Sequence, residues 1–110
     1  MITESLKKIL FEKVINIKNQ YNLDDKLYGV AKDFLFLICD ENIVADRITD
    51  LYEKGYAFKF TKNKNSDIEI WFEIYEDYEF GYIAFNKNNY QVIANEDIKD
   101  FKLFIQYLKD

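Results

Sequence analysis

The chain has 110 residues, a formal charge of −5 and no histidine. So acidic a chain lacks the basic surface that general nucleic-acid binding and adsorption to anionic membranes require. Without histidine it also lacks the commonest general base and catalytic zinc ligand. Because 49% of its residues are hydrophobic and 18% aromatic, we expect one α+β domain over residues 1–110 with a sizeable core.

Three segments in the first half repeat their apolar residues at helical spacing. They cover residues 3–21, 22–38 and 40–55, and the second and third each start at an asparagine or aspartate suited to cap a helix. A glycine after a lysine is expected to end the third. The predicted inward side chains include Leu10, Val14, Ile17, Phe34, Leu35, Ile38, Val44, Ile48, Leu51 and Tyr52.

After Gly55 the apolar period changes from about 3.6 to 2, which indicates strands. Polar turns over 62–66 and 86–89 separate them, so we expect antiparallel pairing. Asn95 is then the expected cap of a last helix. The predicted fold is a four-stranded antiparallel β-meander with three N-terminal helices and one C-terminal helix packed mainly on one face. The predicted strands are 56–61, 67–75, 79–85 and 90–94.

The second of these strands carries the candidate functional residues. Its alternation points Ile68, Ile70, Phe72 and Ile74 toward the helices and its acids and large aromatics the other way. Between Asn65 and Asn86 there are six acids and no lysine or arginine. One-signed charge beside tryptophan and tyrosine is typical of a protein-binding surface, whereas an ordinary solvated strand face is the competing interpretation. The candidate partner-binding residues are Asp67, Glu69, Trp71, Glu73, Tyr75, Glu76, Asp77 and Glu79.

The sequence offers little for catalysis. Cys39 has no histidine partner and is expected to be a small core residue or a helix-end residue. Three glycines cannot build a phosphate-binding loop. Asp67 and Glu69 are close enough along a strand to share an ion, but no calcium-loop pattern accompanies them. We therefore assign no catalytic residue, metal or cofactor, and predict that the chain is not an enzyme.

These features predict a small acidic protein that inhibits a basic partner enzyme stoichiometrically, with a nuclease as the leading class of target. In general character it is similar to bacterial immunity proteins and antitoxins, and alternatively to phage-encoded anti-defence (anti-CRISPR-like) inhibitors. An alternative from another class is an adaptor that homodimerises through a strand edge or helix. One cysteine, and a charged amphipathic segment after Met1 in place of an apolar leader, favour the cytoplasm. The abundance of asparagine and isoleucine, with a single arginine, is typical of AT-rich bacterial or phage genomes.

Overall fold

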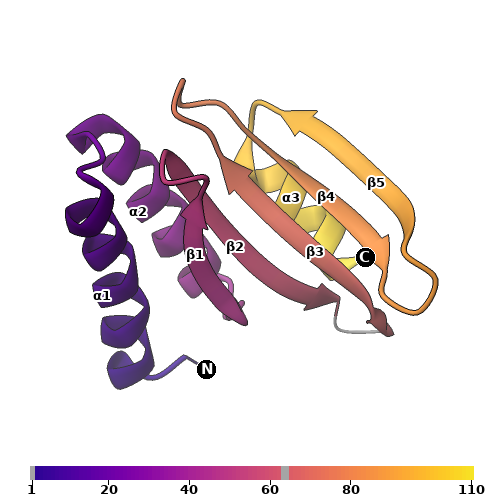
Figure 1. The fold of residues 1–110 in the computed structure, drawn as a ribbon. Helices are drawn as coiled ribbons and strands as arrows, with labels where there is room; N and C mark the ends of the chain where they lie inside the picture. Colours follow the sequence, from indigo (N-terminus) through magenta and orange to yellow (C-terminus); the bar gives the residue numbers. More distant parts are fainter. Residues whose placement is uncertain (1, 63–64) are drawn as a thin grey trace.

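The computed structural model describes residues 2–62 and 65–110. Within them, two helices precede a five-stranded antiparallel sheet of order β1-β2-β3-β4-β5, and a third helix follows it (Figure 1). The predicted α+β class is confirmed. The predicted order of three helices and then four strands is wrong, because two helices and then five strands are present in the described residues. The predicted turn over 62–66 centres on residues 63–64, outside the described part of the chain. The elements are α1 (Glu4–Tyr21), α2 (Asp25–Asp40), β1 (Arg47–Leu51), β2 (Gly55–Lys62), β3 (Asn65–Ile74), β4 (Phe80–Asn86), β5 (Gln91–Ile98) and α3 (Phe101–Lys109).

Side-chain caps set the ends of the first two helices. The Thr3 hydroxyl accepts a hydrogen bond from the Leu6 N–H at 3.1 Å, and the Asp24 carboxylate accepts one from the Leu27 N–H at 2.7 Å. Both satisfy donors that have no partner within the helix. Asn22, predicted to cap α2, instead ends α1 with a φ of 52°, a left-handed conformation that asparagine tolerates. None of the helices in the described residues is long and apolar enough to cross a bilayer.

The segment predicted as a third helix over 40–55 is a loop, strand β1 and a tight turn. The two central residues of the turn, Tyr52 and Glu53, have φ of 53° and 64°, as in a type I′ hairpin turn. A hydrogen bond from the Lys54 N–H to the Leu51 carbonyl closes it at 3.0 Å. Such turns usually carry asparagine or glycine. A Tyr-Glu pair gives no turn signal, so the apolar spacing around it indicated a helix instead.

The C-terminal helix begins later than predicted. Residues 95–97 belong to β5 and pair with β4, and Asp100 caps α3 by accepting a backbone hydrogen bond at 2.8 Å. An asparagine followed by two acids is a good cap pattern. The same polar residues are equally suited to an edge strand whose side chains lie in water, and here all three are exposed.

The core is a cluster of aromatic rings centred on Phe34 of α2. Phe34 is fully buried, and its ring stacks on that of Phe72 with centroids 4.0 Å apart. Leu35 is also fully buried, so the predicted core placement of both α2 residues is confirmed. The cluster joins α2, the sheet and α3, because four more rings lie 4.9 to 6.2 Å from Phe34: Phe58, Phe60, Phe101 and Phe104.

The helices cover one face of the sheet and leave the other uncovered, as the view in Figure 1 shows with α3 behind β4. Contacts join α1 to β1, α2 to β3 and α3 to β5. The predicted orientation of β3 is confirmed, although Glu69 and Glu73 on the uncovered face are half-buried rather than exposed. The β3 side chains on the covered face are Ile70, Phe72 and Ile74, which are fully buried, and Ile68, which is partly buried.

Candidate functional site on the uncovered face of the sheet

The uncovered side of the sheet, called the outer face below, carries every second strand residue because side chains alternate along a strand. The strand register arranges these residues in rows. One row contains Arg47, Lys59, Trp71, Ile83 and Asn95, and the next contains Thr49, Ala57, Glu73, Gly81 and Asp97. A third row contains Leu51 and Gly55 and leads to Tyr75, directly after β3.

Trp71 lies at the centre of the outer face in a charge-balanced setting. Its indole N–H donates to Glu69 Oε2 at 2.9 Å, and Glu69 Oε1 lies 3.2 Å from the Lys59 ammonium. Arg47 follows Lys59 in the same row. The one-signed charge predicted for this face is therefore wrong, because β2 places Lys59 beside Glu69 and β1 adds Arg47 to the same row. With only 15% of its side chain exposed, Glu69 is engaged within the molecule.

Negative charge gathers at the end of the outer face around Gly81. Glu73 of β3 and Asp97 of β5 flank this glycine in one row, so no side chain separates the two carboxylates. The Tyr75 hydroxyl donates to Glu73 Oε1 at 3.1 Å. The pKa of Tyr75 is raised to about 12, mainly by burial, then by Glu73, and least by Asp97 and Asp77. These carboxylates and Tyr75 form what we call the acidic end.

The tip of the β1–β2 hairpin adds a small hollow beside the acidic end. The hollow has a volume of about 150 Å³ and is lined by Leu51, Tyr52, Lys54, Gly55, Tyr75 and Glu76. Tyr52 is 86% exposed, although its left-handed backbone conformation is uncommon for an aromatic residue. Gly55 is buried and packs closely on β3, because an added Cβ atom would overlap the carbonyl oxygen of Ile74.

The other predicted site residues lie at the margins of this surface. Asp67 is exposed at the opposite end of β3, far along the strand from Tyr75. Glu76 and Asp77 are exposed in the β3–β4 turn. Glu79 is exposed and lies 3.2 Å from the Lys99 ammonium. The structure thus brings Glu73, Tyr75, Glu76 and Asp77 together and places Asp67 and Glu69 outside the acidic end.

Sequence reasoning missed Tyr52 and Asp97. Both were assigned to helices, Tyr52 to an inward stripe and Asp97 to a first turn. No local pattern links either residue to Glu73, because the juxtaposition depends on the register across neighbouring strands. The glycine at 81 was the available signal, since glycine within a strand often marks a close approach of backbone or partner.

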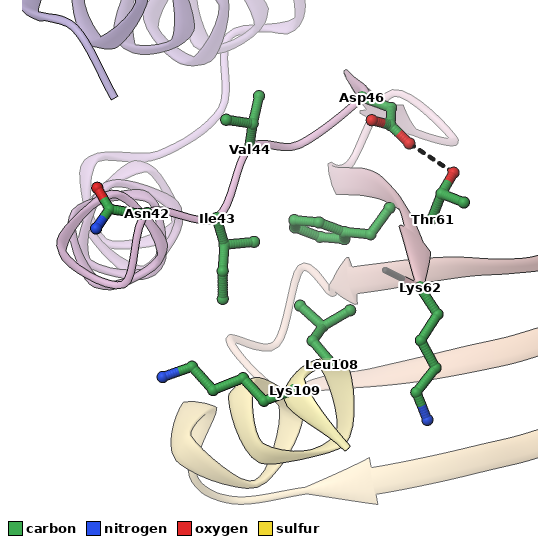
Figure 2. Close-up of a pocket in the computed structure, with 9 residues that line it drawn as sticks. Asn42, Ile43, Val44, Asp46, Thr61, Lys62, Leu108 and Lys109 are labelled. Atoms are coloured by element: carbon green, nitrogen blue, oxygen red, sulfur yellow. Dashed lines mark hydrogen bonds between the residues drawn. The ribbon is translucent and has the colours of Figure 1, made fainter. Parts of the chain in front are cut away.

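A larger cavity of about 440 Å³ lies between the α2–β1 loop, the end of β2 and α3. Figure 2 shows Ile43 and Leu108 facing each other across it. Its two ammonium groups are engaged elsewhere: Lys62 Nζ lies 4.2 Å from the centre of a tyrosine ring on α3, and Lys109 pairs with Glu41. The Asp46 carboxylate in its lining is also engaged, because it accepts a hydrogen bond from the Thr61 hydroxyl at 2.8 Å. We therefore take the acidic end as the better candidate site.

Comparisons with protein-family models, curated proteins and solved structures gave no match. Residues 2–62 and 65–110 contain no group of three or more carboxylate or thiol side chains placed to hold a metal ion. Cys39 is 4% exposed, in keeping with its predicted core position, and burial raises the pKa of its thiol. What the acidic end offers is therefore charge and aromatic surface for binding.

Proposed function

We propose that this chain is a binding protein for a basic protein partner, and that the acidic end of the outer face is its binding surface. The observation that carries the proposal is that Glu73 and Asp97 share one row of the outer face on either side of Gly81, with the Tyr75 hydroxyl bonded to Glu73. Charge of one sign raises the rate of encounter with an oppositely charged partner. The exposed rings of Tyr52 and Tyr75 supply the short-range contacts typical of binding hot spots.

The partner class that best fits is an enzyme acting on nucleic acid. Such enzymes line their grooves with lysine and arginine to meet phosphates. A cluster of carboxylates held on a rigid sheet can occupy the same cations, which excludes the substrate. The proposed activity is therefore stoichiometric inhibition, as by an immunity protein or antitoxin, or by a phage anti-defence protein acting on a host nuclease.

The test compares matched baits for capture from lysate of the native host. Glu73→Lys with Asp97→Lys reverses two charges at the acidic end, while Glu12→Lys with Asp33→Lys reverses two exposed charges on the helices. Net charge changes equally in both. The proposal expects a basic enzyme that binds both wild type and the helix variant. Its association with the Glu73→Lys, Asp97→Lys variant should be at least about tenfold slower, which would support the acidic end as the binding surface.

Inhibition is then titrated with purified components. The proposal expects the activity of the captured enzyme to fall to zero at one chain per active site. Equal weakening by both variants would show attraction by net charge alone and would remove the acidic end as the site. Binding without loss of activity would contradict the inhibitor role.

An adaptor that homodimerises through an edge strand is less well supported. β5 is an edge of the sheet (Figure 1), and its pairing with β4 is interrupted by a register shift between Ala84 and Phe85. Bulges of this kind are a common device for preventing edge-to-edge pairing. A monomer in light scattering at high protein concentration is the expected result.

A further inference from the structure

The hollow at the β1–β2 hairpin tip has the composition of a receptor for one cationic side chain. The rings of Tyr52 and Tyr75, with Leu51, supply apolar and aromatic lining, and Glu76 supplies a carboxylate. Lysine and arginine have this same combination of an apolar stem and a charged end.

We propose that this hollow binds a single lysine or arginine side chain, with its methylene stem between Tyr52 and Tyr75 and its charge at Glu76. Aromatic faces attract cations, and the attraction adds to that of a nearby carboxylate. The volume of about 150 Å³ suits one side chain rather than a larger ligand. Naming this side chain as the anchor of a partner rests on the proposed function, whereas the affinity of the hollow for a cation does not.

The conformation of Tyr52 supports the proposal. Its φ of 53° lies where asparagine or glycine would be favoured, and its ring is 86% exposed. This backbone conformation is unfavourable for a tyrosine, and the turn nevertheless places Tyr52 in the lining of the hollow. Lys54 also lines the hollow, so its like charge should weaken binding of a cation.

The experiment is an NMR titration of the isotopically labelled protein with capped lysine and capped arginine, each as the N-acetyl amide. Capped norleucine is the matched control, because it keeps an apolar stem and lacks the charge. With the two cations we expect saturable shifts of the Leu51, Tyr52, Gly55 and Tyr75 amides. The affinity for capped norleucine should be at least about fivefold lower.

Variants test the individual roles. Tyr52→Asn removes the ring but suits the left-handed turn, and Glu76→Gln removes the charge. Each should weaken binding roughly two- to fivefold, whereas Tyr52→Phe should bind like wild type and Lys54→Ala more tightly. Equal shifts with norleucine, or unchanged affinity in both Tyr52→Asn and Glu76→Gln, would overturn the proposal. Circular dichroism of each variant checks that the fold is retained.

The two proposals fail separately. If the partner binds Tyr52→Asn like wild type but not Glu73→Lys with Asp97→Lys, the hollow is not the anchor and the acidic end remains the interface. If the hollow binds capped lysine but no basic protein is captured, the cation site stands and the proposed function does not.

Discussion

Replacing Phe34 by alanine should be among the most destabilising single changes in this chain. The side chain is fully buried and its ring contacts five others, stacking on Phe72 at 4.0 Å. Truncation of a buried phenylalanine costs about 3–5 kcal/mol through lost transfer energy and the cavity left behind. Aromatic pairs add about 0.5–1.5 kcal/mol each beyond buried area, so the expected loss is near the upper end, about 5 kcal/mol.

Equilibrium unfolding in urea, followed by circular dichroism, measures this loss. With a slope of about 1.5 kcal/mol per molar urea, the midpoint should fall by about 3 M. Small domains are stable by only about 5–15 kcal/mol. If wild type lies at the low end of this range, the variant is expected to be partly unfolded in buffer, and a stabilising salt such as sulfate then restores a measurable transition.

Phe36→Ala is the matched control on the same helix. Phe36 is 49% exposed, and among the described residues its ring pairs with that of Phe11 only, at a centroid distance of 4.7 Å. Its loss should be about 1 kcal/mol. If Phe34→Ala costs no more than Phe36→Ala, the ring cluster does not hold α2 to the sheet and the packing described above is wrong.

Three further predictions concern glycine and tyrosine. Gly29→Ala should stabilise the protein by about 0.5–1 kcal/mol, because Gly29 lies within α2 and an added methyl meets no atom within 4 Å. Gly55→Ala should destabilise the protein by more than about 1 kcal/mol, because its methyl would overlap the β3 backbone. Paired thermal melts that gave both variants the same sign would contradict this contrast. Tyr56→Phe should cost about 1 kcal/mol in urea unfolding, because the buried hydroxyl donates to the Val14 carbonyl at 3.0 Å; no loss would mean that this bond contributes nothing. Stability should fall as pH rises from 10.0 to about 12, because the raised pKa of Tyr75 makes the unfolded chain release this proton first. Tyr75→Phe should reduce that slope, and an unchanged slope in alkaline unfolding experiments would assign the effect to other groups.

The elements that the sequence predicted well have long, regular apolar patterns. α1 and α2 repeat their apolar residues over several turns, and β3 alternates from Ile68 to Ile74, so the apolar period alone specifies these elements. The segment around Ile48 has an apolar spacing that suits a helix or a strand, and pairing with β2 decides between them. Residues 95–97 likewise change from cap to strand because β4 supplies partners. Tertiary context outweighed local propensity in both cases.

The candidate site was predictable to the extent that one strand defines it. Alternation placed Trp71, Glu73 and Tyr75 on one face without any knowledge of neighbouring strands. The engagement of Glu69 by Lys59, and the approach of Asp97 to Tyr75, required the register of separate strands. Sequence alone therefore overestimated the acidity near β3 and underestimated it beyond Gly81.

The ring cluster around Phe34 has a consequence for synthesis of the chain. Its members are spread from α2 through β2 and β3 to Phe104 of α3, and domains generally fold as units while translation proceeds at about 5–20 residues per second. Until residues 101–108 have been made, the apolar faces of α2 and the sheet lack part of their cover. The ring cluster therefore cannot be complete before α3 has been synthesised, and until then the apolar surface that α3 covers stays exposed.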